Sequence, residues 1–236
     1  MTMRFGVSHW AMWPERLAEP ASPGAAGGDP LPALAAMPAM MRRRVEPLGR
    51  IALHAAYASR GADAPLPVVF ASRYGDVARS ITLLRQLVGG ETPSPTAFSL
   101  SVHNAIGALW SIASGDTAPY TAIAAGDETV EAAFIEALGL LADGTPAAMV
   151  VCYDEPLPPP YDIYAGHADT AHAWACRVAP IDEGGFSLTS RLAGTDAVAA
   201  PADRVADRRV LEFFHSDAER LTHQAGARVW EWRRHA

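Results

Sequence analysis

Between residues 45 and 153, helix-like and strand-like segments alternate, and this alternation constrains the fold more than any other feature of the sequence. Helices are predicted where apolar residues recur every three or four positions, and strands where short apolar runs are bounded by turn residues. The predicted strands cover 66–72, 120–125 and 147–153, each next to a segment with helical spacing. Strands that alternate with helices predict an α/β fold with a layered sheet.

Each predicted helix has one face that we expect to be buried. Asp76 is the expected N-cap of the second helix, because its carboxylate can accept hydrogen bonds from the free backbone amides of the first helical turn. The residues expected on the buried faces are Leu48, Ile51, Ala52, Ala55 and Ala56 in the first helix, Val77, Ile81, Leu84 and Val88 in the second, Val130, Ala133, Phe134, Ala137, Leu138 and Leu141 in the helix after residue 126, and Leu211, Phe214, Ala218 and Leu221 in the last.

We expect one domain over 1–236, with an α/β core in 1–155 that begins with a strand in "MRFGVSHWAMW". Residues 156–236 should form a Pro-rich connector, a β-hairpin and a C-terminal helix over 209–235. The hairpin is expected from "HAWACRVAP" and "GGFSLTSRL", and "AFSLSV" near residue 100 is expected to be extended. A long loop is predicted at 18–38, which is rich in Ala, Pro and Gly.

Composition excludes several classes of function. The net charge is −7, so no electrostatic footprint for nucleic acid is present. All 19 basic residues are Arg, which excludes a Schiff-base or P-loop lysine. Cys152 and Cys176 are too few for a disulfide framework and are expected to be buried, reduced thiols. With neither a signal-peptide pattern nor a membrane span, we expect a cytoplasmic protein.

The strongest candidate for a catalytic site is the tight turn between the strand at 120–125 and the helix that follows it. It carries Gly126, Asp127 and Glu128, with no Cys or Ser. An acid in the first helical turn contributes about 0.3–1 kcal/mol against the helix dipole, so capping alone explains these residues. A carboxylate is also a poor acyl acceptor, and its charge opposes a developing oxyanion. Capping is therefore the preferred interpretation.

Other candidate residues carry less signal. One possible metal set is formed by His167, Asp169, His172 and Cys176, but the spacing matches no compact zinc pattern, so chance is the better interpretation. His103 and Asn104 begin a helix and are interpreted as its cap. No metal site and no cofactor are expected. Neither a nucleophile elbow motif nor a dinucleotide-binding motif is present.

Residues 94–155 resemble the N-terminal half of a β-ketoacyl synthase, an enzyme with the thiolase fold. In "SPTAFSLSVHNAIGALW", Phe98, Ser101, Val102 and Asn104 match a segment that precedes a helix in that family. "DTAPYTAIAAGDETVEAA" aligns without a gap with the family's strand and nucleophile elbow. "RRRVEPLGRIALHAAYAS" resembles its first long helix, and "GFSLTSRL" the strand after its Gly-containing turn. The resemblance implies a thiolase-like, layered α-β-α fold with a mixed sheet, equivalent to half of the ketosynthase fold.

Two departures from the family decide what the resemblance implies. Asp127 stands where the nucleophilic Cys is expected. The second thiolase half, which supplies two catalytic histidines, has no counterpart, and Gly144-Thr145 and Gly194-Thr195 have no His before them. The chain therefore resembles the chain length factors, inactive subunits that pair with a ketosynthase. The truncated form is similar to that of aryl polyene and related fatty acid or polyketide systems.

The expected partner is thus a catalytic ketosynthase in a heterodimer, with acyl carrier protein bound through the complex. The strand at 120–125 would pair with its counterpart across the dimer. Alternatives are an autonomous acyl-thioester enzyme that uses Asp127 or His103, and a structural homodimer. The resemblance assigns the dimer interface to Ser101, Val102, His103, Asn104, Tyr120, Thr121 and Ile123, and the end of the partner's acyl tunnel to Phe98, Leu100, Ile106, Leu109 and Trp110.

Overall fold

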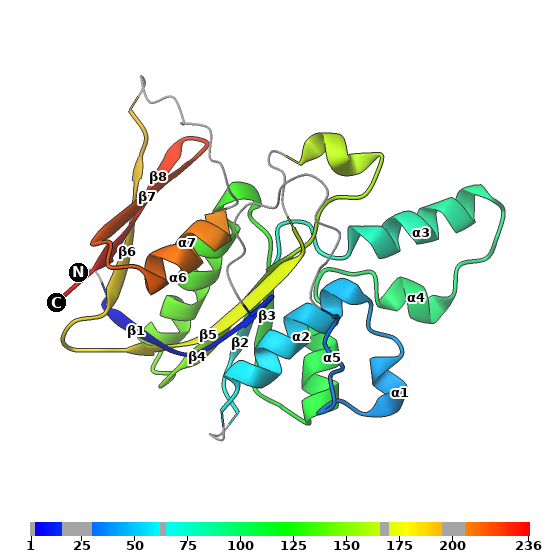
Figure 1. Ribbon diagram of the computed structural model, residues 1–236, viewed down its shortest axis with the longest axis horizontal. Helices are drawn as coiled ribbons and strands as arrows, with labels where there is room; N and C mark the ends of the chain where they lie inside the picture. The colour runs from blue at the N-terminus through cyan, green and yellow to red at the C-terminus, as the bar shows by residue number, and fades with distance from the viewer. Residues whose placement is uncertain (1–2, 16–29, 62–64, 166–169, 195–205) are drawn as a thin grey trace.

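The computed structural model describes residues 3–15, 30–61, 65–165, 170–194 and 206–236. They form a mixed eight-stranded sheet with the strand order β3-β2-β4-β5-β1-β6-β8-β7 (Figure 1). Strand β2 pairs in parallel with β3 and β4, and the remaining pairs are antiparallel. The strands are β1 (Phe5–Trp13), β2 (Val68–Ala71), β3 (Tyr120–Ile123), β4 (Ala148–Asp154), β5 (His172–Pro180), β6 (Phe186–Leu192), β7 (Arg220–Ala225) and β8 (Arg228–Arg234).

Helices cover both faces of the sheet, which confirms the predicted layered α/β fold (Figure 1). Helices α6 and α7 pack on one face, over Phe134, Trp174 and Trp232. Helices α2 and α5 pack on the other face, over Phe70 and Tyr153. The α-helices are α1 (Ala39–Arg42), α2 (Pro47–Ser59), α3 (Val77–Val88), α4 (Pro95–Ser99), α5 (Ala105–Ser114), α6 (Thr129–Ala142) and α7 (Ala206–His215), and the 3-10 turns are η1 (Gly126–Glu128) and η2 (Tyr161–Tyr164).

The apolar spacing predicts the buried faces of α2 and α6 correctly, and all five residues expected on α2 are buried. Asp76 caps α3, with its Oδ1 accepting from the Arg79 amide at 2.9 Å. The expected face of α3 is only partly buried. Ile81 is in the core, but Leu84 and Val88 are exposed, because the distal half of α3 projects beyond the sheet beside α4 (Figure 1).

The predicted C-terminal helix is wrong beyond residue 215. Helix α7 ends at His215, and the rest of the chain forms β7 and β8, joined through Gly226 at a φ of +52°. In these strands every second side chain is buried, among them Trp230 and Trp232. That period of two identifies a half-buried hairpin, whereas the prediction extended the helical spacing of α7 through it.

Two further predictions are corrected. Strands β5 and β6 exist as predicted, but they do not form a hairpin with each other, because β1 lies between them in the sheet. Strand β1 pairs with β5 along most of its length and with β6 at Phe5. The segment "AFSLSV" is not extended: it contains the end of α4, whose N-cap Ser94 accepts from the Ala97 amide. Most of the predicted 18–38 loop lies outside the described residues.

Strand β3 lies at one edge of the sheet, and within the described ranges it pairs with β2 alone. Its four residues are all half-buried. Across the same ranges, no helix is both long enough and apolar enough to span a bilayer.

Candidate functional site: the elbow after strand β3

The predicted elbow is present: β3 ends at Ile123, a 3-10 turn covers Gly126–Glu128, and α6 begins at Thr129. Gly126 has a φ of +58°, a conformation that favours glycine. The Thr129 hydroxyl accepts from the Ala125 amide at 3.0 Å and donates to the Gly126 carbonyl at 2.7 Å. The only hydroxyl of the elbow is therefore used in holding the turn closed.

Asp127 lies at the apex of the elbow, with its side chain 54% exposed. Its Oδ1 is 2.7 Å from Nη2 of Arg73, which lies two residues after the end of β2. The carboxylate is thus paired with a guanidinium at the carboxyl ends of two neighbouring parallel strands. A carboxylate that is paired with a guanidinium has little nucleophilicity toward a thioester.

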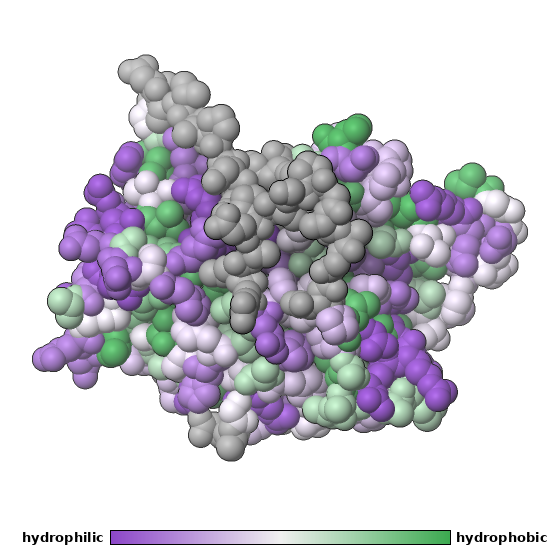
Figure 2. Space-filling model, in the orientation of Figure 1, coloured by the Kyte–Doolittle hydropathy of each residue, from purple (hydrophilic) through white to green (hydrophobic). Residues whose placement is uncertain are grey.

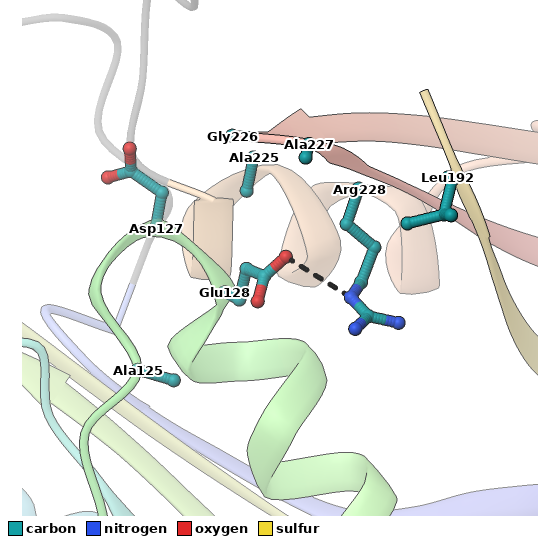
Figure 3. Close-up of a pocket in the computed structure, with 8 residues that line it drawn as sticks. All are labelled: Ala125, Asp127, Glu128, Leu192, Ala225, Gly226, Ala227 and Arg228. Carbon is teal, nitrogen blue, oxygen red and sulfur yellow. Dashed lines mark ion pairs between the residues drawn. The ribbon is translucent and has the colours of Figure 1, made fainter. Parts of the chain in front are cut away.

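The next two acids, Glu128 in the 3-10 turn and Glu131 in α6, hold the C-terminal hairpin. Glu128 accepts from Trp230 Nε1 at 3.1 Å and forms an ion pair with Arg228 at 3.7 Å (Figure 3). Glu131, whose side chain is fully buried, accepts from His223 Nδ1 at 2.9 Å and from Trp232 Nε1 at 3.3 Å. These contacts place the β7–β8 turn against the elbow. A shallow pocket of about 400 Å³ remains between them, lined by Ala125, Asp127, Glu128, Leu192, Ala225, Gly226, Ala227 and Arg228 (Figure 3).

A second polar cluster joins the carboxyl ends of β2 and β4. Asp154 accepts from the Ser72 hydroxyl at 2.7 Å and from the Arg73 amide at 3.0 Å. His103 Nε2 donates to the Ser72 carbonyl at 2.9 Å, which ties the start of α5 to the same point. Burial and the charge of Asp207 raise the pKa of Asp154 to about 6, against the hydrogen bonds that favour its ionised form. The cluster fixes the loop that carries Arg73.

Among the described residues, no group of three or more His, Cys, Asp or Glu could hold a metal ion. His167 and Asp169 lie outside these residues. His172 instead contacts Asp207 Oδ2 through Nε2 and the Thr170 carbonyl through Nδ1, both at 2.8 Å. The Asp207 contact is an ion pair when the imidazole carries a proton.

This ion pair fixes the start of α7 to β5. Burial opposes ionisation of Asp207, but the His172 charge and hydrogen bonds from His172, Trp174 and the Arg208 amide together hold its pKa below the usual value. Burial raises the pKa of both cysteine thiols, Cys152 and Cys176, so both are inert, as expected from the sequence.

The residues expected at the end of the acyl tunnel differ in their burial. Ile106, Leu109 and Trp110 of α5 are buried in this chain's own core, where Trp110 packs on Tyr57. Phe98 is 64% exposed, and Leu100 is half-buried beside the same core. Of these five residues, Phe98 and Leu100 are the two with surface that another molecule could contact.

The residues expected at the dimer interface lie in two segments, the turn before α5 and strand β3, and α5 contacts β3. Val102 and Asn104 are exposed, and Ser101 and His103 are half-buried. Asn104 is the N-cap of α5 but makes no side-chain capping bond, so the capping interpretation holds for its position only. On β3, the Tyr120 ring packs against Gly107, and the Thr121 hydroxyl donates to Glu136 at 3.3 Å. Ile123 packs beside the core under α6.

Sequence reasoning missed three residues that organise the elbow: Arg73, Glu131 and Asp154. Glu131 had a detectable signal, because it lies between Val130 and Ala133 on the helical face that was expected to be apolar. Arg73 and Asp154 each follow a predicted strand directly, and the carboxyl ends of parallel strands meet at one edge of a sheet. Their contacts with Asp127 and Ser72 depend on which strands are neighbours, which the sequence does not show.

The mixed sheet with helices on both faces and the elbow at the carboxyl end of a parallel strand match the expected thiolase-like fold. The model of the β-ketoacyl synthase N-terminal domain matches residues 10–233, and the chain belongs to that family. A search among curated proteins finds no match.

Solved structures share the fold. One is a chain of a complex between a ketosynthase, ApeO, and its chain length factor, ApeC, from Xenorhabdus doucetiae, with a TM-score of 0.82 and 19% identity over 98% of this chain and 100% of that one. A β-ketoacyl synthase from Burkholderia phymatum gives a TM-score of 0.54 and 14% identity over 72% of this chain and 53% of its own. A type II polyketide ketosynthase solved with its acyl carrier protein, AntDE:AntF, gives 0.55 and 12% identity over 82% and 70%.

Proposed function

We propose that this chain is a non-catalytic subunit of the chain-length-factor type, which pairs with a catalytic β-ketoacyl synthase and shapes its acyl tunnel. The observation that carries the proposal is the elbow itself, where the family's nucleophile position holds Asp127 in an ion pair with Arg73. A retained elbow without a thiol favours a structural role. The match along the full length of one chain of a ketosynthase–chain length factor complex supports the same role.

In this proposal the partner pairs with the free edge of β3. The Pro119 and Ile123 carbonyls accept from β2, so the backbone groups of Tyr120 and Ala122 face away from it. An open edge of this kind is a template for another strand. Helices α5 and α6 flank the edge, and each presents one exposed isoleucine, Ile112 and Ile135. Both helices contact β3.

Phe98 is the residue that we place at the end of the partner's acyl tunnel, with Leu100 behind it. Burial of each acyl CH₂ contributes about 0.8 kcal/mol, whereas a clash with a packed ring costs about 1–3 kcal/mol. A single aromatic ring therefore limits chain length without any chemistry. The product class we propose is an acyl chain of a fatty acid, polyketide or aryl polyene pathway.

An autonomous enzyme is the weaker alternative. Asp127 is held by Arg73, and the Nε2 proton of His103 is donated to a backbone carbonyl. Neither group is poised for general base catalysis on a thioester. The other alternative, a structural homodimer, would use the same β3 edge.

The test is co-expression with ketosynthases of the same organism, followed by size-exclusion chromatography. We expect a 1:1 complex and no turnover of acyl-carrier-protein thioesters by the isolated chain. Ala122→Pro removes an outward-facing amide without touching the β2 pairing, and should abolish the complex while leaving the melting temperature of the isolated chain nearly unchanged. Turnover by the isolated chain that Asp127→Ala removes would overturn the proposal.

A further inference from the structure

One carboxyl group, that of Asp154 at the end of β4, holds most of the loop after β2. Its Oδ1 accepts from the Ser72 hydroxyl at 2.7 Å, and both of its oxygens lie 3.0 Å from the Arg73 amide. The Ser72 hydroxyl in turn accepts from the Gly75 amide at 2.8 Å. Three donors of one loop therefore depend, directly or through Ser72, on Asp154.

This loop is connected to two other elements. The Arg73 guanidinium forms the 2.7 Å ion pair with Asp127 at the apex of the elbow. The Ser72 carbonyl lies 2.9 Å from Nε2 of His103, just before α5. A change in how firmly Asp154 holds the loop therefore reaches both the elbow and the start of α5.

The surroundings of Asp154 differ from those of most charged side chains, which water screens. Hydrophilic residues gather over the β7–β8 hairpin in Figure 2, where the side chains of Arg220 and Arg233 are more than half exposed. Asp154 lies instead on a strand that has β2 on one side and β5 on the other. Its register partner on β5 is His172, and Asp207 of α7 contacts that imidazole at 2.8 Å. Two carboxyl groups thus share one imidazole neighbour.

These surroundings make the ionised form of Asp154 costly. Burial, and then the charge of Asp207, raise its pKa to about 6, against the bonds from Arg73 and Ser72 and the charge of His172. Protonation of Asp154 therefore relieves repulsion between carboxylates near neutral pH.

Other titratable groups face the same point. Glu155 follows Asp154 directly, and burial together with the charges of Asp76, Asp154 and Glu46 raises its pKa to about 7. Asp76 is the N-cap of α3, so the repulsion extends to the start of that helix. Two further neighbours stay protonated near neutral pH, because burial raises their pKa values well above the usual range: Cys152 and Tyr153.

Protonation changes what Asp154 can do for the loop. An ionised carboxylate accepts at both oxygens, and hydrogen bonds to a charged acceptor are about twice as strong as bonds between neutral groups. A protonated carboxyl group uses one oxygen as a donor and keeps less capacity to accept. The Arg73 amide, which faces both oxygens, therefore loses most when Asp154 is protonated.

We propose that Asp154 is a pH-sensitive latch, whose ionised form holds the Ser72–Arg73 loop against the elbow and whose protonated form loosens that loop and its contact with Asp127. The latch is a property of this chain by itself. It goes beyond the proposed function, and it stands or fails without any partner subunit.

The test is hydrogen exchange of the isolated full chain, followed by NMR at pH values from about 7 down to about 5. Each rate is expressed as a protection factor relative to the intrinsic rate at that pH. We expect the protection factor of the Arg73 amide to fall about tenfold over this range, because it loses a charge-assisted bond. The internal control is the Met149 amide, which donates to the Pro67 carbonyl at 2.9 Å and should change by less than about twofold.

Three variants locate the titrating group and its route to the elbow. Asp154→Asn removes the titration, so its Arg73 amide should show low protection at every pH. The matched control Asp143→Asn changes an exposed carboxylate at the end of α6 and should keep the wild-type response. Asp127→Asn should also keep the response at Arg73, but should remove the smaller response of the Glu128 amide in the elbow.

Three results would overturn the latch. One is a protection factor of the Arg73 amide that does not change with pH in the wild type. Another is a pH response that persists in Asp154→Asn, because the titrating group would then be His103 or His172. The third is an equal fall at Met149, which would mean that the whole sheet loosens. If the Glu128 amide responds in Asp127→Asn as in the wild type, the connection to the elbow is wrong.

Discussion

Glu131 is the residue whose replacement tests best how the elbow is held. Its buried carboxylate accepts from His223 Nδ1 and Trp232 Nε1, so it joins α6 to both strands of the C-terminal hairpin. Glu131→Ala leaves both buried donors without their acceptor, at about 1–3 kcal/mol each. Removal of one partner from a buried pair typically costs about 3–5 kcal/mol, and we expect a loss of that size in the free energy of unfolding.

Denaturation in urea, followed by tryptophan fluorescence, measures this loss, since Trp230 and Trp232 both lie in the hairpin. Glu131→Gln keeps an acceptor oxygen for the two donors and should cost less than half as much. The matched control is Glu136→Ala on the same helix, whose half-buried carboxylate makes one 3.3 Å bond to Thr121 and should change stability by less than about 1 kcal/mol. A Glu131→Ala loss no larger than that of the control would refute the reasoning, as would equal losses for Gln and Ala.

Two other substitutions test the sheet. Asp154 has a raised pKa of about 6, so the native state binds a proton that the unfolded chain releases, and stability should fall as pH rises from about 4 to 7. Asp154→Asn should flatten that part of the pH profile of the unfolding free energy, and an unchanged slope would contradict the assignment. Gly107→Ala should destabilise the fold by about 1–3 kcal/mol, because its Cβ would lie 2.5 Å from the Tyr120 ring; a melting temperature equal to that of the wild type would contradict the close packing of α5 on β3.

The sequence predicts the elements between residues 45 and 153 well because each carries its own periodic signal. Helices α2 and α6 bury the expected residues, and β2, β3 and β4 lie where β-branched or small apolar runs place them. The elbow follows from the junction of two such elements. The absence of a cysteine from the elbow is equally visible in the sequence, because position 127 is an aspartate.

The wrong predictions concern elements whose structure depends on contacts between residues that are far apart in the sequence. The insertion of β1 between β5 and β6 depends on pairing between residues about 170 positions apart, and no local pattern records it. Residues 209–235 were assigned to one helix because Leu211 and Phe214 start a stripe that Leu221 continues by coincidence. Burial of alternate residues in β8 against α6 and α7 overrides that signal, as tertiary packing often does.

The three acidic residues at the start of α6 serve a structural purpose. Asp127 pairs with the loop after β2, while Glu128 and Glu131, one and four residues farther on, bind the hairpin through two tryptophans, an arginine and a histidine. A thiol at position 127 would lose the Arg73 ion pair, and Asp127→Cys would still face the β7–β8 turn across a shallow pocket whose lining, among the described residues, includes no histidine. We therefore expect Asp127→Cys to gain no condensing activity, alone or in the complex, measured as release of CO₂ from malonyl-carrier-protein. Activity in that variant would mean that the elbow lacks only its sulfur, and that the docked hairpin is no barrier to catalysis.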